Sequence, residues 1–572
     1  MKKKIQYLLA ISTLFVLVQS SCKKDFLEQE VDGRLPVENI WSTTDRAFGF
    51  LNNTYTNLPN VYMRISGAML ATASDEAKHA SDASSIQDIF NGSWSPVNTV
   101  ENVWNNHYAG IRKANLFLEN IDSVPLQKRD NAQGVDLDKL KVRERMKGEA
   151  RFLRAFFYFD LVKRYGGVPL VLKSLTREED LASIPRASID DCMNQILLDC
   201  DSAANRLPLA YTGSIPELDG SGQTGRATKG AAMALKARAL LYYASPLFNI
   251  NNNSTRWAAA AAAAKAVMDL GGGTRYGLLP LSGSVTHNNI FYQATGAAQY
   301  HNEIVFSTSY ADDNTLERNN APLIINGLGL TNPTQEMVDA FGMSNGLAIT
   351  DSRSGYNPNN PYANRDPRFY AAIKYHGQTI SQNDLVQPLN VAQGIDKLNS
   401  LNATRTGYYL GKFMSNSSVW DLRTVRASRT SVLIRFAEVL LNYAEAQNES
   451  VGPEASVYAA VERIRQRAGL NPFKLPTGLS KEQMREVIRD ERRVELCFEE
   501  HRFFDVRRWR LYGSSSVNVP ITGVNVTIDN LFNTTYNYFT VENRIWSPKM
   551  YFMPIPQTEI LKSNQLTQNP GW

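Results

Sequence analysis

Cysteine and histidine are scarce in this chain, which has four cysteines and six histidines among 572 residues. The histidines are scattered, and no CxxC, HExxH or HxxEH spacing occurs, so a zinc or haem site has little support. If Cys192 and Cys200 share one helix, the eight residues between them span about 12 Å, which is too far for a disulfide. We therefore predict that these two cysteines and Cys497 are buried free thiols.

The sequence also lacks an apolar run long enough to cross a bilayer, which takes about 20 residues. Its apolar stretch at residues 8–18 follows three lysines at residues 2–4 and is interrupted by Ser12 and Thr13. A basic start followed by a short apolar run is typical of a secretory signal peptide. We place that signal peptide at residues 1–21.

Cys22 follows this segment directly, after two serines, and the arrangement resembles the lipobox of bacterial lipoproteins, whose cysteine is acylated. Two or three acyl chains hold a soluble body at a membrane, because each buried methylene contributes about 0.8 kcal/mol. Gln19 stands where the strict lipobox pattern has leucine, so a plain secretory signal is the alternative. We expect Cys22 to be lipidated.

The chain also lacks a large excess of charge of either sign. The whole chain has 61 basic and 56 acidic residues, and without residues 1–21 the balance is 58 to 56. A nucleic-acid partner would require a clustered basic surface. We expect no such partner.

Long helices are predicted where apolar residues recur at helical spacing. These segments are 147–171, 226–249, a helix that opens at Trp257, 431–449 and 456–470. Gly166 and Gly167 are expected to end the first helix, and Pro169 prevents its continuation. Small and aromatic residues at the expected contacts make the helix pairs resemble tetratricopeptide-like units.

Residues 275–430 have a different composition, rich in glycine, asparagine, proline and tyrosine, with short β-type runs such as NEIVFSTSY. We predict a mainly α fold, in which a tetratricopeptide-like scaffold of helix pairs carries a loop-rich variable region with short strands. Residues 22–572 are expected to form one body with an N-terminal helical region (22–274), the variable region (275–430), and C-terminal helices and loops (431–572).

The segment RDERRVELCFEEHRFFDVRRW, residues 489–509, has six arginines and six carboxylates. Read as one helix, it is apolar on two sides and neutral overall, which favours a buried structural element over a DNA-binding helix. Its charges are expected to pair at i, i+3 as Arg492/Glu495, Glu499/Arg502 and Asp505/Arg508. Glu499 and Glu500 are adjacent and diverge on a helix, so they are not expected to act as a catalytic pair.

Nine segments in order resemble the SusD/RagB family, outer-membrane lipoproteins of Bacteroidetes that capture nutrients for a TonB-dependent, SusC-like transporter. They include SCKKDFLE, EARFLRAFFYFDLVKRYGGVPL, FAEVLLNYAEAQNE, the segment 489–509 and FMPIPQTEILKSNQLTQNPGW. The resemblance implies one α-rich body, a glycan as the most frequent ligand, and no catalysis. The family's signature segments are mostly scaffold, so they do not locate the ligand.

A sugar-binding site needs exposed aromatic faces and a few fixed polar groups, so aromatic residues in polar loops are the candidates. The early loop 73–104 offers Asp75, Trp94 and Asn98, whose general position matches loops that contact ligand in the resembled family. Packing of Trp94 beneath the loop is the alternative. Trp104, in contrast, is expected to be a core residue.

A second candidate group of aromatic residues lies in the variable region and consists of Tyr292, Tyr300 and Tyr310. Arg353, Tyr356 and Tyr362 form a third, weaker group. The nearby Asp366-Pro367-Arg368 is instead expected to be a structural turn with an ion pair.

Together these features predict a cell-surface lipoprotein, anchored in the outer membrane, that binds oligosaccharide and delivers it to a SusC-like TonB-dependent transporter. The alternative is a peptide-binding or lid-type adaptor of such a transporter without glycan affinity. We expect no catalytic residues, no metal site and no cofactor, while a structural Ca²⁺ in a loop stays open. A glycoside hydrolase would need two carboxylates about 5–10 Å apart in a cleft.

Overall fold

The computed structural model describes residues 37–125, 141–175, 183–212, 223, 225–281, 286–293, 301–309, 314–382, 385–414, 428–512 and 520–572. The predicted signal peptide and Cys22 lie outside these residues, as do Tyr300 and Tyr310. Within the described part of the chain, none of the helices combines the length and apolar character that a bilayer crossing requires.

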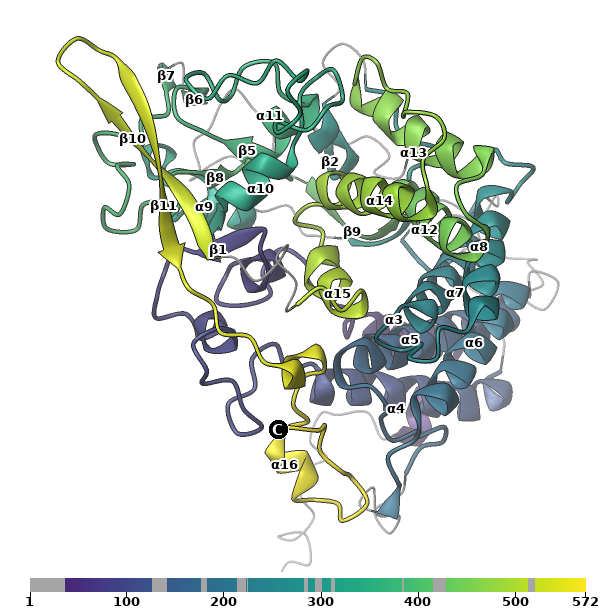
Figure 1. The fold of residues 1–572 in the computed structure, drawn as a ribbon. Coiled ribbons are helices and arrows are strands. Elements are labelled where there is room, and N and C mark those ends of the chain that lie inside the picture. Colours follow the sequence, from purple (N-terminus) through teal and green to yellow (C-terminus); the bar gives the residue numbers. More distant parts are fainter. Residues whose placement is uncertain are drawn as a thin grey trace, which may run out of the picture.

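Helices form most of the regular structure and lie side by side along one half of the molecule (Figure 1). Their bounds are α2 (Val37–Ile40), α3 (Thr44–Tyr55), α4 (Trp104–Asn120), α5 (Val142–Tyr165), α6 (Ile189–Arg206), α7 (Lys229–Ala244), α8 (Ser254–Met268), α9 (Thr315–Asn320), α10 (Gln335–Ala340), α11 (Pro367–Ala372), α12 (Phe436–Val451), α13 (Ala455–Ala468), α14 (Lys481–Glu495), α15 (His501–Arg508) and α16 (Gln557–Ile560). Each helix from α3 to α8 packs on the next one, and α12 then packs on α8 and carries α13 and α14. The predicted mainly α scaffold is confirmed.

Local capping explains where these helices begin and end. Thr228 caps α7 by accepting a hydrogen bond from the Ala231 amide, and Ser480 with Gln483 forms a capping box at the start of α14. Gly166 ends α5 with a φ of +75°, a left-handed conformation that favours glycine, as the sequence predicted.

In the described part of the chain, the strands form five small antiparallel sheets. Their bounds are β1 (Ala77–His79), β2 (Tyr292–Gln293), β3 (Ile304–Ser309), β4 (Thr331–Pro333), β5 (Ile373–Lys374), β6 (Thr379–Gln382), β7 (Leu385–Pro388), β8 (Tyr409–Leu410), β9 (Ser428–Arg435), β10 (Ile521–Ile528) and β11 (Thr534–Glu542). The pairings are β1 with β4, β5 with β8, β6 with β7, β10 with β11, and β9 between β2 and β3.

The sequence prediction of this region was partly right. NEIVFSTSY contains strand β3, as expected. The helix predicted for residues 431–449 was wrong over its first five residues, because β9 extends to Arg435 and α12 begins only at Phe436. In the sequence, the run Ser-Val-Leu-Ile leads into the apolar residues of α12 with only Arg435 between them. In the structure, it belongs to β9 and pairs with β3.

The apolar residues form two main cores. The first lies within the helical array, from Trp41 near α3 through α14 and α15, and continues to Leu566 near the end of the chain. The second lies among residues 290–414 and also takes Val524 and Val526 from the β10–β11 hairpin. That hairpin projects from the body in Figure 1.

Residues 489–509 join the two cores. They form two helices rather than the single predicted one, because α14 ends at Glu495 and both Phe498 and Glu500 adopt positive φ. Leu496 packs in the first core, whereas Cys497 and Phe498 pack in the second. The predicted structural role is confirmed, and so is the prediction that apolar side chains point to two sides.

One of the three predicted ion pairs in this segment is present, Asp505 with Arg508 at 2.8 Å. The other two predictions were wrong. Arg492 pairs with Asp505 within the same segment, and the other charges pair with distant parts of the chain: Glu495 with Arg368, Arg435 and Arg467, Glu499 with Arg435 and Lys412, and Arg502 with Asp75. The segment therefore connects the two cores through ion pairs as well as through apolar contacts.

The remaining cysteines behave as predicted. Cys192 and Cys200 lie on α6, and together with Cys497 they are buried free thiols. Trp104 is a core residue, and Asp366 caps α11 while pairing with Arg368 at 2.7 Å, as expected for a structural turn.

Candidate functional site

Two members of the early-loop group, Asp75 and Trp94, are buried, which agrees with the alternative that Trp94 packs beneath the loop and does not favour ligand contact for either side chain. Trp94 is 3% exposed, and its ring packs edge-on against Trp572 with centroids 5.1 Å apart. Asp75 is 6% exposed and accepts hydrogen bonds from Arg502 at 2.7 and 2.8 Å. A ring without a free face cannot stack on a sugar, and a carboxylate engaged by a buried guanidinium is a structural group.

The charges around Asp75 explain its protonation state and that of its neighbour. Burial alone would raise the pKa of Asp75, but Arg502 and Arg493 outweigh it and hold the pKa below its usual range. Burial, reinforced by the Asp75 carboxylate, raises the pKa of Glu76 to about 8. Glu76 is therefore protonated at neutral pH inside the fold.

The other predicted residues stay predictions. Asn98 is half-buried in the early loop, where its amide donates to Asp88 at 3.0 Å. Tyr292 begins β2, and its backbone pairs with Arg429. Tyr300 and Tyr310 lie outside the described residues.

Tyrosines from three separate segments meet where the β10–β11 hairpin packs on the body. This tyrosine surface consists of Tyr356, Tyr362, Tyr375, Tyr536 and Tyr538. Tyr362 lies at its base, with ring centroids 4.4 Å from Tyr375 and 5.4 Å from Tyr536. The structure thus brings Tyr356 and Tyr362 of the third predicted group together, whereas Arg353 pairs with Asp351 at 2.7 Å.

The hairpin register places two of these tyrosines on one face. Tyr536 lies opposite Val526 and Tyr538 opposite Val524, and both valines are buried in the second core. Residues directly opposite each other on an antiparallel pair share a face, so both tyrosine rings lie on the body side of the hairpin. Tyr538 is nevertheless 48% exposed, and its phenol is hydrogen-bonded to Tyr356.

The tyrosine surface has the chemistry of an open recognition site. Its rings offer apolar faces next to phenol hydroxyls, and burial raises the pKa of Tyr538, so that hydroxyl is a neutral donor and acceptor. The adjoining loop exposes Asn357, Asn359 and Asn360. Sequence reasoning missed Tyr536 and Tyr538, although the alternation in TTYNYF indicates that they share a strand face.

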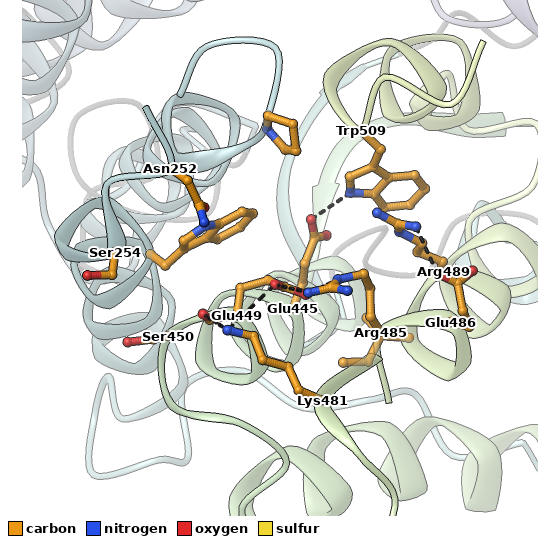
Figure 2. Close-up of a pocket in the computed structure, with 13 residues that line it drawn as sticks. Asn252, Ser254, Glu445, Glu449, Ser450, Lys481, Arg485, Glu486, Arg489 and Trp509 are labelled. Atoms are coloured by element: carbon orange, nitrogen blue, oxygen red, sulfur yellow. Dashed lines mark hydrogen bonds and ion pairs between the residues drawn. The ribbon is translucent and has the colours of Figure 1, made fainter. Parts of the chain in front are cut away.

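A second candidate is a cavity of about 420 Å³ between α8, α12 and α14 that is bordered by Trp509 (Figure 2). Its charged lining residues are Glu445, Glu449, Glu486, Lys481, Arg485 and Arg489. Arg485 donates two hydrogen bonds of 2.6 Å to Glu449, and the Trp509 indole donates to Glu445 at 2.7 Å. Burial would raise the pKa of Glu445, but Arg508 outweighs it and lowers that pKa.

Glu499 and Glu500, which were not expected to act as a catalytic pair, are half-buried and form ion pairs. Glu499 accepts from Arg435 and Lys412, each at 2.7 Å, and Glu500 pairs with Arg64 at 2.8 Å. Among the described residues, no group of three or more His, Cys, Asp or Glu side chains is arranged to hold a metal ion.

Comparison with known proteins agrees with this architecture. Residues 290–572 match the model of the SusD family, and residues 25–241 match a related model described as starch-binding associating with outer membrane. SusD-like protein P25 of Formosa agariphila is 23% identical over 478 residues, which cover 81% of this chain and 77% of that protein.

Solved structures share the fold over almost the whole chain. A SusD-like protein from Bacteroides fragilis is 29% identical, with a TM-score of 0.77 over 94% of this chain and 100% of that one. A laminarin-binding SusD-like protein is 20% identical, with a TM-score of 0.62 over 93% of this chain and 100% of that one. With two family models that together span most of its length, the chain belongs to the SusD/RagB family of Bacteroidetes.

Proposed function

We propose that this protein binds oligosaccharide at the cell surface and delivers it to a SusC-like TonB-dependent transporter, without catalysing a reaction itself. The tyrosine surface carries the proposal, because it joins partly exposed aromatic rings to neutral hydroxyl and amide groups at a loop-rich edge of the fold. The laminarin-binding relative and a SusD-like carbohydrate-binding protein from Bacteroides fragilis support a glycan as the ligand class.

An open surface of this kind predicts modest affinity. A solvated edge buries less of its ligand than a closed pocket does, so we expect dissociation constants between about micromolar and millimolar. Water-bridged contacts to the asparagine side chains are expected to add to direct ones.

Titration calorimetry of residues 22–572 against a glycan panel that includes laminarin tests the proposal. Tyr538→Ala removes the most exposed ring of the hairpin face, and we expect affinity to fall about two- to twelvefold, which corresponds to an aromatic contact of about 0.5–1.5 kcal/mol. Phe532→Ala is the matched control: it lies on the same hairpin, its side chain is 87% exposed, and it is not part of the tyrosine surface.

The outcomes separate the proposed function from its alternative. If no glycan binds at millimolar concentration while the transporter co-purifies with the protein, the chain is a peptide-binding or lid-type adaptor. If glycan binds but Tyr538→Ala and Phe532→Ala behave alike, the tyrosine surface is not the site. Release of cleavage products from a bound glycan would contradict the non-enzymatic part of the proposal.

Anchoring through Cys22 is the membrane part of the proposal, and the match to a family model described as associating with outer membrane supports it. We expect palmitate label to be incorporated into the wild-type chain and not into Cys22→Ser, which should leave the membrane fraction. Equal labelling of both chains would contradict acylation at Cys22.

A further inference from the structure

The cavity of Figure 2 belongs to a different part of the molecule from the tyrosine surface. It is a partly open cavity between α8, α12 and α14 of the helical array, and none of the five tyrosines lines it. Its volume of about 420 Å³ lies within the usual range of small-molecule sites, about 300–1,000 Å³. The cavity is therefore large enough for a compact ligand.

The charges of its lining are balanced and already paired. Glu449 is held by Arg485, Glu486 by Arg489 at 2.9 Å, and Glu445 at 2.5 Å by Arg508, which lies outside the lining. Lys481 donates to the Glu449 carbonyl oxygen at 2.5 Å and lies 3.9 Å from the Glu449 carboxylate. A charged ligand would compete with these pairs for a partner, and breaking the buried Glu445–Arg508 pair would leave one of its members without a counter-charge, which is costly. The electrostatics therefore favour a neutral ligand.

The paired carboxylates and guanidinium groups of the lining can also hydrogen-bond to the hydroxyl groups of a ligand. A carboxylate offers about four acceptor positions and a guanidinium five donors, so the Glu449–Arg485 pair, joined by two hydrogen bonds, keeps further capacity on both sides. A hydroxyl both donates and accepts, and it can bond to both members of such a pair. Ser254 and Ser450 add neutral hydroxyls to the lining, and Trp257 adds an apolar indole.

We propose that this cavity is a second saccharide site, which takes one neutral sugar ring or a disaccharide through its hydroxyls, separately from the tyrosine surface. The inference rests on the proposed function for its ligand class. Beyond that function, it specifies where the second sugar binds, limits its size to one or two rings, and predicts that charged sugars bind less well than neutral ones. A chain of sugar units held at the tyrosine surface and a short sugar held in the cavity would bind independently.

Fluorine NMR of the mature chain labelled with 5-fluorotryptophan reads the cavity directly, because Trp257 and Trp509 both line it. Their signals are assigned with Trp257→Phe and Trp509→Phe. The probes are glucose, galactose, mannose and their disaccharides, each hexose compared with its uronate and its 2-amino form. We expect a saturable shift of a cavity signal with at least one neutral sugar, and at least tenfold weaker binding of its charged counterparts.

Two variants test the site itself, and a melting curve checks that each is folded. Ser450→Phe fills the cavity and is expected to abolish the shift. Glu449→Gln keeps the shape but frees Arg485, so neutral-sugar binding should weaken and preference should move toward the uronate. Tyr538→Ala is the matched control and is expected to leave the cavity signals unchanged.

The contrary results are distinguishable. If laminarin or another panel glycan binds but the cavity signals never shift, the second site is refuted while the proposed function stands. A shift that survives in Ser450→Phe, or tighter binding of a charged sugar by the wild-type chain, also refutes the second site. If no saccharide binds anywhere on the protein, both proposals fail together.

Discussion

Buried charged side chains hold distant segments of this protein together, and Glu495 is the clearest case. Glu495 is fully buried and takes hydrogen bonds from Arg435 at 2.7 Å and Arg368 at 3.0 Å, with Arg467 as a third partner. The acidic and basic composition of residues 489–509 was visible in the sequence. Its partners were not, because Arg368 and Arg435 lie far away along the chain.

Removing the Glu495 charge is expected to destabilise the fold strongly. In Glu495→Gln three guanidinium groups lose a shared counter-charge in a buried site, and breaking buried pairs typically costs about 3–5 kcal/mol. Urea unfolding followed by circular dichroism measures the change. Asp269→Asn, which breaks the exposed pair with Lys265, is the control and should leave the midpoint of unfolding nearly unchanged. Equal effects of the two substitutions would contradict the prediction.

Glu76 is expected to make stability depend on pH. Its pKa is about 8 in the folded protein, above the ordinary value of 4.5, so the folded chain keeps a proton that the unfolded chain has released. Stability from this group is fully present below pH 4.5 and is lost as pH rises toward 8. Glu76→Gln should therefore gain stability relative to wild type between pH 5 and pH 8, measured by urea unfolding at both values. A difference that does not change with pH would contradict this assignment.

The burial of Asp75 and Trp94 shows what residue-level prediction could not settle, and why. Both occur in a polar loop with the composition of a binding site, and the sequence contains no local sign that either is covered. Asp75 is engaged by Arg502 from a helix more than 400 positions later, and Trp94 is covered by Trp572 at the end of the chain. Contacts of such sequence separation leave no periodic pattern to detect.

Individual elements were more predictable, because the signals that define them are local. The end of α5 at Gly166 and the body of α7 follow from a glycine and from apolar spacing. The strand β9 was not predictable from the spacing of apolar residues, because its apolar residues lead into those of α12. The alternation that places Tyr536 and Tyr538 on one face of β11 was present but is short.

Two helical glycines test how closely the helices pack. A Cβ on Gly110 of α4 would lie 2.5 Å from the Phe157 ring of α5, whereas a Cβ on Gly49 of α3 would meet nothing within 4 Å. Gly110→Ala is expected to destabilise by about 1–3 kcal/mol through overpacking. Gly49→Ala should stabilise by up to about 1 kcal/mol because alanine favours helix. Thermal melting of both variants checks the signs, and stabilisation by Gly110→Ala would show that α4 and α5 are less tightly packed.

At the scale of the whole molecule, the predicted regions 22–274, 275–430 and 431–572 do not map one-to-one onto the two cores. The second core takes Tyr62 and Ala77 from the first region and Val524 from the third, in addition to residues 290–414. Sequence patterns predicted the helical scaffold and the short strands correctly, whereas the bounds of the three regions stay predictions. How they interlock depends on segments that are distant in sequence, above all residues 494–498.

This connection predicts that the two cores unfold together. Phe498 packs in the second core, Leu496 two residues earlier packs in the first, and Arg368 on α11 pairs with Glu491 on α14 at 2.6 Å. Phe498→Ala leaves a cavity in the second core and should cost about 3–5 kcal/mol. Because the cores share this segment, hydrogen exchange in α5 and in α11 should report the same loss. If α5 keeps its wild-type protection while α11 loses its own, the helical array is stable without the variable region, and the two parts are separate folding units.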